Sequence, residues 1–235
     1  MIDIRRFETL GKADHGWLKA NFHFSFADYF RQDRLHWGKL RVWNDDIIAP
    51  RSGFPPHPHA DMEIITYVRK GAITHKDSLG NVGRTEAGDV QVMTAGTGIT
   101  HAEYNLEDEE LHSFQLWILS DRKGHAPSWG ARPFPKNERA GRFTVLASGR
   151  AEDLGGDEGA LPIHADARVL GATVKAGETI SYDLGGRKGY LVPAKGTVEI
   201  EGEVVNARDG AALAEIESLT IKAIENCELV LVDTA

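Results

Sequence analysis

The sequence has very little cysteine. Cys227 is the only cysteine among 235 residues, so no disulfide can form within the chain. The first residues, Met1–Arg6, contain no apolar segment followed by a cleavage site, so we expect no secretory signal. Both absences are typical of a protein kept in a reducing compartment, and we expect the protein in the cytoplasm.

Long hydrophobic runs and basic clusters are also missing. No stretch approaches the roughly 18 consecutive apolar residues of a membrane-spanning helix, so we expect no membrane partner. The formal net charge is −8, and lysine and arginine are not gathered on any segment. Because a surface that follows phosphates needs a basic face, we expect no direct binding of nucleic acid.

Glycine and proline punctuate the whole chain. The 25 glycines and 9 prolines separate short segments that are rich in valine, isoleucine, threonine and aromatic residues. Long amphipathic helices are absent, and we expect at most one short helix, near Ser25–Phe30. The pattern predicts an all-β protein. The expected strands are Leu40–Trp43, Glu63–Val68, Val90–Met93, Ser113–Leu119, Arg142–Leu146, Val169–Val174, Thr197–Ile200 and Leu229–Val232.

A weak internal repeat favours two tandem barrels over one. The segments Tyr67–Thr74 and Val192–Glu199 share a rhythm of strand, polar residues, glycine and strand, and a second glycine turn follows each. The chain is long enough for two barrels of roughly 110 residues each. The stretch Asp121–Glu138 holds three prolines and two glycines and is expected to be an irregular crossing segment. We therefore predict a first barrel over residues 1–130, a linker over 131–142 and a second barrel over 143–235.

Two short motifs in the N-terminal half carry the chemistry. His57 and His59 flank a proline, and alternate residues of an extended chain share a face, so both imidazoles are expected to point the same way. His101 and Glu103 have the same spacing. A sheet closed into a barrel can bring the two strands together with all four side chains facing inward. Three imidazoles and one carboxylate suit a divalent first-row metal and leave positions for water or substrate.

Each of these residues alone would be weak evidence. A single histidine is more often a hydrogen-bonded structural residue than a ligand, and only the combination of both motifs raises metal binding above that interpretation. Glu63 shares the face of His57 and His59 if their strand continues. The glycine-rich turn Thr94–Thr100 lacks the lysine and the following helix of a phosphate loop, so it is interpreted as a bend into the barrel mouth.

The other histidines fit ordinary roles. His75 and His112 lie in strand contexts where a structural hydrogen bond explains them. No histidine follows His164, so the second barrel cannot repeat the site and we expect one metal per chain. Four further histidines have no partner at ligand spacing: His15, His36, His125 and His164.

At this point the residues resemble a known family. The segments Gly53–His59, Met62–Tyr67 and Met93–Asn105 closely resemble the two motifs of the pirins, a branch of the cupins. The resemblance is specific over about residues 14–119 and faint after 140, and Phe22–Phe26 lacks the threonine that commonly follows the histidine. Further matching segments are Asp14–Leu18, Phe24–Tyr29, Leu40–Asp46 and Leu116–Ile118.

The resemblance implies a bicupin, in which two double-stranded β-helix or jelly-roll barrels follow one another. It also implies an iron-type metal in the first barrel, with ligands that correspond to His57, His59, His101 and Glu103. Iron is the expected ion, and nickel, cobalt, copper, manganese and zinc suit the same ligands. Glu63 matches an acid that is a ligand in many other cupins and that lies close to the metal in pirin-like proteins.

Some pirins are similar to quercetin 2,3-dioxygenases (quercetinases), oxidoreductases that open a flavonol ring with O₂ and release carbon monoxide. The resemblance therefore predicts an enzyme for a small aromatic, flavonol-like substrate and O₂. The metal would bind the deprotonated hydroxyl and the neighbouring oxo group of the substrate as Lewis acid and template. Glu103 or Glu63 would take the hydroxyl proton as general base.

Two alternatives to the enzyme remain open. Other pirins are regulators, so the chain could be a metal-dependent redox sensor without enzymatic activity that acts through a protein partner. A structural remnant that binds metal adventitiously is the third interpretation. Sequence alone does not separate them, because the apolar residues that could hold a flat ring are also explained as barrel core. These residues are Phe54, Ile65, Met93 and Trp117.

Overall fold

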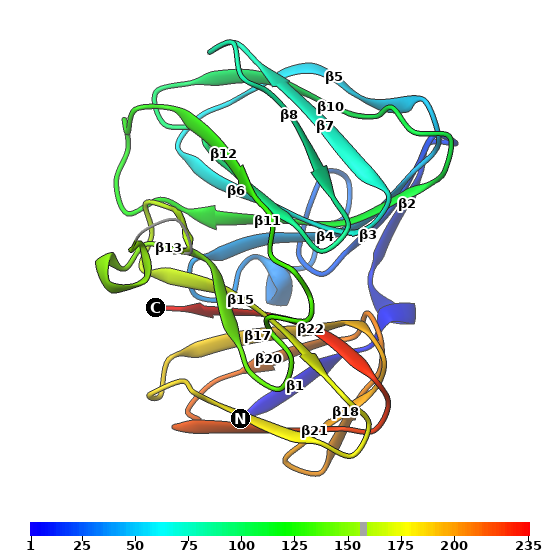
Figure 1. The fold of residues 1–235 in the computed structure, drawn as a ribbon, viewed down its shortest axis with the longest axis vertical. Helices are drawn as coiled ribbons and strands as arrows, with labels where there is room; N and C mark the ends of the chain where they lie inside the picture. Colours follow the sequence, from blue (N-terminus) through cyan, green and yellow to red (C-terminus); the bar gives the residue numbers. More distant parts are fainter. Residues whose placement is uncertain (156–158) are drawn as a thin grey trace. The chain divides into compact units, whose positions relative to one another are not determined.

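The computed structural model describes residues 1–155 and 159–235, and nearly all of its regular structure is β-strand (Figure 1). The chain divides into two compact units. The N-terminal unit comprises Gly11–Phe134 and Leu161–Ala165, and the C-terminal unit comprises Met1–Leu10, Pro135–Ala160 and Asp166–Ala235. The all-β, two-barrel class predicted from the sequence is confirmed, since each unit is built from two antiparallel sheets.

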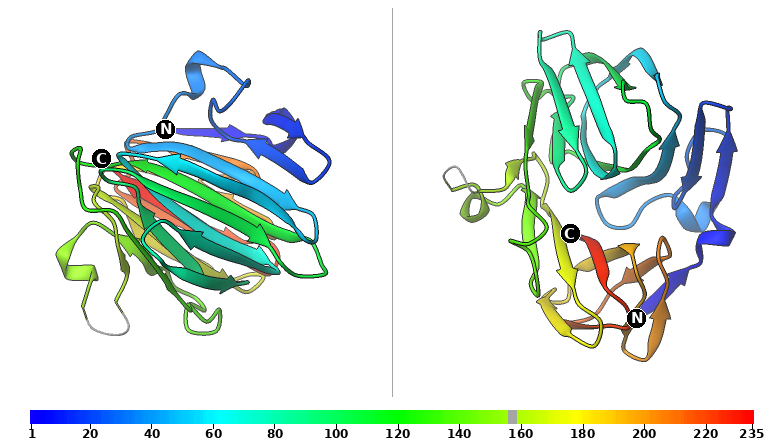
Figure 2. Two further views of the ribbon diagram at one scale, coloured as in Figure 1. Left: turned by 90° about the horizontal axis from the view of Figure 1, so that it is seen from above. Right: turned by 45° about the vertical axis from the view of Figure 1, so that its right-hand side comes forward.

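The N-terminal unit has twelve strands and one short 3-10 helix, Gln32–Arg34. The strands are β2 (Gly11–Asp14), β3 (Leu18–Phe22), β4 (Leu40–Ile48), β5 (Ser52–His59), β6 (Met62–Lys70), β7 (Ala72–Asp77), β8 (Val82–Glu86), β9 (Val90–Thr94), β10 (Ile99–Asn105), β11 (Leu111–Leu119), β12 (Ser128–Arg132) and β14 (Leu161–Pro162). The larger sheet has the order β12-β9-β6-β11-β4-β3-β2, and the smaller sheet has the order β5-β10-β7-β8. The right-hand view of Figure 2 shows the strands of both sheets curving around a common interior.

The C-terminal unit repeats the two-sheet plan. Its strands are β1 (Ile2–Arg5), β13 (Thr144–Ser148), β15 (Ala167–Val174), β16 (Thr179–Asp183), β17 (Lys188–Lys195), β18 (Val198–Ile200), β19 (Glu203–Val205), β20 (Gly210–Leu213), β21 (Ser218–Ala223) and β22 (Cys227–Thr234). One sheet contains the order β1-β20-β17-β22-β15-β13, and the other has the order β16-β21-β18-β19. Two 3-10 helices, Phe7–Thr9 and Ala151–Asp153, belong to this unit.

The first residues of the chain differ from the predicted domain ranges. The range 1–130 placed them in the first barrel, but β1 pairs with β20, with Ile2 opposite Leu213. Ile2 and Ile4 pack against the apolar core of the C-terminal unit. Their alternation indicates an edge strand without indicating its partner, which explains why the sequence did not place them. The ranges 131–142 and 143–235 remain predictions.

The short helix expected near Ser25–Phe30 is not formed. Phe26 and Tyr29 exchange backbone hydrogen bonds of 3.0 Å across a tight turn, and Ala27 has a left-handed φ of 49°. Two aromatic residues of this segment, Phe26 and Tyr29, pack against Phe22, with ring centroids 5.4 and 6.4 Å apart, and Phe30 is exposed. Among the described residues, no helix has the length and hydropathy that a membrane crossing requires.

Two glycines mark equivalent turns in the two units. Gly71 lies between β6 and β7 with φ of 77°, and Gly196 lies between β17 and β18 with φ of 80°. Residues with a side chain rarely adopt this left-handed conformation, so glycine is needed at both turns. The internal repeat noted in the sequence therefore corresponds to the same strand–turn–strand feature in each unit.

Candidate metal centre

Three histidines converge where β5 and β10 pair. The register places His57 opposite His101 and His59 opposite Ile99. The ligand nitrogens of His57, His59 and His101 all lie within 4.8 Å of one another, and Nε2 of His57 is 3.1 Å from Nε2 of His101. The fold therefore brings together the three imidazoles that the sequence analysis singled out, as a group that could hold one metal ion.

A local irregularity sets the approach of these strands. Between His101 and Glu103 the pairing of β10 with β5 shifts by one residue, as in a β-bulge. Gly53 lies against this shift, and a Cβ atom there would be only 2.2 Å from the carbonyl oxygen of Glu103. Only glycine allows β5 to run this close to β10, so Gly53 helps to hold the histidine pair in register.

The hydrogen bonds around His57 and His101 fix where their protons lie. Nδ1 of His57 lies 2.8 Å from the carbonyl oxygen of Pro55, which can only accept, so Nδ1 carries a proton and Nε2 is the nitrogen left to bind a metal. Nδ1 of His101 lies 3.4 Å from Nδ1 of His75, and Nε2 of His75 lies 2.9 Å from a carboxylate oxygen of Asp77.

The carboxylate of Asp77, at the end of this series of hydrogen bonds, determines which group donates at each step. Burial raises the pKa of Asp77, but hydrogen bonds from His75 and Asn81 outweigh burial and bring the pKa below its usual value. The ionised Asp77 accepts a hydrogen bond from the Nε2–H group of His75. Nδ1 of His75 therefore has no proton and accepts a hydrogen bond from the Nδ1–H group of His101. Nε2 of His101 then carries a free lone pair and faces Nε2 of His57. We name this chain, Asp77–His75–His101, the histidine relay.

Burial keeps the imidazoles neutral. Desolvation, followed by the nearby His57, lowers the pKa of His59 to about 4. Desolvation together with its histidine neighbours lowers the pKa of His101 to about 3. Both rings therefore present lone pairs near neutral pH, which is the state that binds a metal.

Glu103 lies beside His101 but is held by amide donors. Its Oε1 accepts from Gln91 at 2.7 Å, and its Oε2 accepts from Gln115 at 2.8 Å. Burial raises the pKa of Glu103 to about 7, although the hydrogen bonds from Gln115, Thr66 and Gln91 oppose the shift. Glu103 is outside the group of three imidazoles, so its predicted place as fourth ligand stays a prediction.

A second group of potential ligands consists of His75, His101 and Glu103. All three are buried, and His75 already uses Nε2 for Asp77 and turns Nδ1 toward His101. The ring of His75 is also stacked on Trp129, with centroids 4.8 Å apart and an angle of 8°. This packing agrees with the structural role expected for His75 and favours the first group as the metal position.

Glu63 does not share the face of the histidines, contrary to the expectation for a continuing strand. The extended conformation is interrupted between β5 and β6 at Asp61, whose φ is 52°, and β6 then joins the other sheet. Glu63 pairs with Ile118, whereas the inward-facing Trp117 pairs with Ile64, so Glu63 points to the opposite side of the sheet. There its carboxylate accepts from Thr94 at 2.7 Å and from Ser120 at 3.0 Å. This position removes the premise for Glu63 as a base at the metal.

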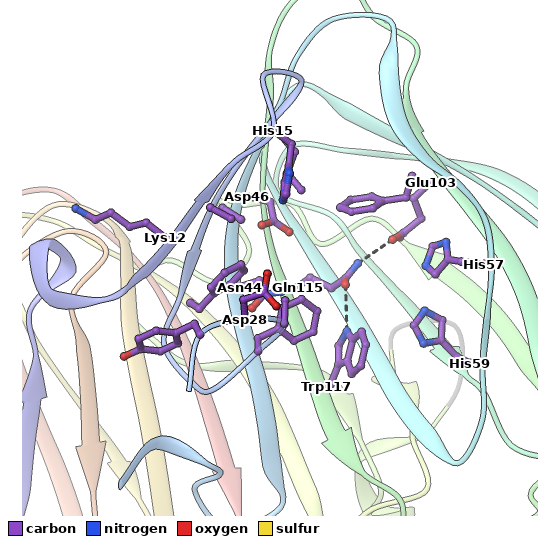
Figure 3. A pocket seen from close by; sticks show the side chains of 18 residues that line it. Lys12, His15, Asp28, Asn44, Asp46, His57, His59, Glu103, Gln115 and Trp117 are labelled. Carbon is purple, nitrogen blue, oxygen red and sulfur yellow. Dashed lines mark hydrogen bonds between the residues drawn. The ribbon is translucent and has the colours of Figure 1, made fainter. Parts of the chain in front are cut away.

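A cavity of about 560 Å³ opens beside the histidines (Figure 3). The volume lies within the range of about 300–1,000 Å³ that is usual for small-molecule sites. His57, His59 and Glu103 form one end of it, and Gln115 links Glu103 to Trp117 through two hydrogen bonds. Its lining consists of Lys12, Ala13, His15, Leu18, Ala20, Phe22, Phe26, Ala27, Asp28, Tyr29, Asn44, Asp46, Phe54, His57, His59, Glu103, Gln115 and Trp117.

Aromatic rings continue from the histidines along the cavity. His59 meets the edge of Trp117 at 5.0 Å, and Trp117 meets Phe26 at 5.4 Å. The Phe54 ring lies 6.1 Å from that of His57, at a tilt of 53°. Such edge-on contacts leave ring faces and edges available to a flat aromatic ligand.

The sequence analysis found part of this lining. Phe54 and Trp117 face the cavity, whereas Ile65 and Met93 are buried outside the lining. Asn44, Asp46 and Gln115 were missed. A signal existed for the first two, because they are polar residues at i and i+2 in the mainly apolar strand Leu40–Ile48.

The chain is similar to known proteins over its whole length. Residues 3–118 match the family model described as Pirin, and residues 151–234 match the model described as Quercetinase C-terminal cupin domain. A protein named "Pirin-like protein" from Caulobacter vibrioides is 63% identical over 236 residues and is covered completely, as is this chain. A protein named "Quercetin 2,3-dioxygenase" from Escherichia coli is 37% identical over 235 residues, which cover 99% of this chain and 98% of the relative.

A solved structure is also similar over the whole chain. The crystal structure of bacterial pirin YhhW from Escherichia coli, in complex with nickel(II), has a TM-score of 0.92 and 35% sequence identity. The match covers 100% of this chain and 99% of that protein. With complete relatives at this level of identity, the chain belongs to the pirin family.

Proposed function

We propose that the protein is a metal-dependent dioxygenase of the quercetin 2,3-dioxygenase type, which opens a flavonol-like ring with O₂. The observation that carries this proposal is the convergence of three imidazoles at one end of an aromatic-lined cavity. Relatives that cover the whole chain and carry the name quercetin 2,3-dioxygenase support it.

The ligands of the ion would be His57, His59, His101 and Glu103. Lone pairs on neutral imidazoles are the correct donors for a divalent first-row metal, and the chain supplies them without a rearrangement of protons. Iron is the ion we propose, and the nickel(II) complex of a relative supports a divalent ion at such a site. When bound, the metal would supply a Lewis acid that favours the deprotonated substrate and a template for O₂.

Glu103 is the residue we propose as general base. It lines the cavity next to His101, and in the metal-free protein burial raises its pKa to about 7, so it holds a proton more readily than an ordinary carboxylate. Gln115 donates to one carboxylate oxygen and thereby holds Glu103 toward the cavity. Glu63 is not included in this role, because it lies on the other face of β6.

The aromatic wall would hold the rings of the substrate. Trp117 and Phe26 meet edge to face, and Phe54, which also lines the cavity, lies beside His57. Packing against these rings excludes water from the substrate, which strengthens hydrogen bonds to Glu103 and Gln115. The chain would therefore bind, orient and desolvate the substrate, and move one proton.

Oxygen uptake tests the proposal directly. Metal-loaded protein, metal-free protein and His101→Ala are each given quercetin in an oxygen electrode, and carbon monoxide in the headspace is measured. We expect uptake and carbon monoxide with metal-loaded protein only. Uptake no faster than with the same amount of free metal ion contradicts the enzyme and leaves the regulator, whose partner affinity would change with the oxidation state of the metal.

A further inference from the structure

Two polar side chains of β4 face the cavity away from the histidines. Asn44 and Asp46 belong to its lining, yet each residue is only 4% exposed. Asn44 pairs with Gln115 on β11, and Gln115 faces the cavity, so the alternation of β4 turns both residues to that side. Figure 3 shows Asp46 and Asn44 beyond Gln115, away from Glu103, His57 and His59.

Each of the two has an oxygen without a partner. Within residues 1–155 and 159–235, Oδ1 of Asn44 and Oδ1 of Asp46 make no hydrogen bond, although both atoms are shielded from bulk solvent. Buried polar atoms of proteins are nearly always bonded, so an exception indicates a missing ligand or water. Asp45, between them in the sequence, faces the other side of the sheet and is paired with Arg69.

The chemistry of the pair suits a hydroxyl group. Burial raises the pKa of Asp46 well above its usual value, and the carboxylates of Asp45 and Glu103 add to that shift. A carboxyl group that holds its proton offers a donor and an acceptor oxygen, as the carboxamide of Asn44 does. A phenolic hydroxyl needs both, because it donates one hydrogen bond and accepts others. An anionic ligand group would instead meet the nearby carboxylates.

We infer that Asn44 and Asp46 form a subsite that hydrogen-bonds a ring hydroxyl of a polyhydroxylated aromatic substrate. This inference rests on the proposed function, which places the chelating end of the substrate at the histidines. Gln115 connects the two ends, because it donates to Glu103 and stands beside Asn44 on the neighbouring strand. The subsite makes the cavity selective for flavonols with additional hydroxyls over flavonols that carry the chelating group alone.

The test compares quercetin with 3-hydroxyflavone, which has the chelating 3-hydroxy-4-oxo group and no other hydroxyl. Dissociation constants for both are measured by fluorescence quenching with metal-loaded wild type, Asn44→Leu, Asp46→Leu and Asp46→Asn. We expect the preference for quercetin to fall by about tenfold or more in the leucine variants, since a hydroxyl would be left unpaired in a buried site. Asp46→Asn keeps a donor and an acceptor and should keep most of the preference.

The control is Glu63→Gln, which changes a buried carboxylate on the other face of the same sheet and should leave the preference unchanged. A ratio of dissociation constants that is the same in wild type and in folded, metal-loaded leucine variants overturns the subsite and assigns the two oxygens to bound water. Oxygen uptake is recorded separately. An Asp46-dependent preference without uptake refutes the dioxygenase alone, whereas uptake with an unchanged ratio refutes the subsite alone.

Discussion

The histidine relay predicts that a residue outside the metal ligands controls metal affinity. In Asp77→Asn, the carboxylate that accepts from His75 is replaced by an amide whose nitrogen is a donor. The amide oxygen is expected to stay on the backbone N–H groups of Leu79 and Asn81, which donate to Oδ1 at 2.9 and 3.1 Å. The amide nitrogen then faces His75 Nε2, which must become an acceptor.

The change in proton position passes along the histidine relay to the metal position. When His75 Nε2 accepts, its proton moves to Nδ1, and His101 Nδ1 must accept in turn. The proton of His101 then occupies Nε2, which is the atom 3.1 Å from His57 Nε2 that is needed for the metal. Losing such an orienting contact typically costs about 10- to 100-fold in metal affinity, or about 1.4–2.7 kcal/mol. We expect Asp77→Asn to weaken binding by that factor.

Two measurements check this prediction. Competition of Co²⁺ between the protein and a chelator gives the affinity, and ¹⁵N shifts of the histidine side chains in metal-free protein report which nitrogen of His101 is protonated. Asp121→Asn is the matched control, because Asp121 also accepts from a histidine, His125, at 2.6 Å, and neither residue belongs to the metal group. A folded Asp77→Asn protein with wild-type affinity, or with the proton of His101 still on Nδ1, would refute the relay.

Four further outcomes follow from the same site. Elemental analysis of untagged protein should find one metal per chain, because both ligand groups among the described residues share His101 and no histidine follows His164; two tightly held ions would contradict this. His57→Ala, His59→Ala and His101→Ala should each lose most of the metal while circular dichroism shows a folded barrel, because the large apolar core does not depend on the ion as a zinc finger does. Metal affinity should rise with pH up to about 7, by up to about tenfold per unit, because Glu103 has a raised pKa and must lose its proton to become a ligand; titration of Glu103→Gln should lack this rise. Glu63→Gln should retain metal and turnover within about twofold in matched assays, since its carboxylate points away from the cavity, and a larger loss of turnover would restore it as a base.

Much of the fold could be predicted because local patterns repeat. Alternating apolar residues and glycine turns indicated sheet, and the glycines at 71 and 196 have the same left-handed conformation between corresponding strands. The partner of β1 could not be predicted, because an edge strand with isoleucine at alternate positions fits either sheet. The expected helix at Ser25–Phe30 failed for a related reason: closely spaced aromatic residues such as Phe26 and Tyr29 can cover a turn as well as a helical face.

The candidate ligands could be predicted from the spacing of residues in the sequence, but the residues around them could not. The pairs at 57 and 59 and at 101 and 103 follow the two-residue period of a strand, so their common faces are a local property. The contact between His57 and His101 depends on the register of two strands separated by more than forty positions. The error at Glu63 came from one residue, Asp61, whose left-handed φ of 52° reverses the chain where no glycine announces a turn.

The run Asn44-Asp45-Asp46 shows, within one strand, both a local pattern and neighbours that depend on the fold. Three polar residues interrupt an apolar strand, and alternation sends the middle one to Arg69 on one face and the outer two into the cavity on the other. A buried carboxyl with an unpartnered oxygen reduces stability, and core packing alone would favour an apolar residue in its place. Asn44, on the same strand, lies opposite Gln115, which holds the carboxylate proposed as base. These polar groups thus do not help the barrel to fold. They lie near the proposed reaction site, separated from it by one side chain, and a bound ligand would complete their hydrogen bonds.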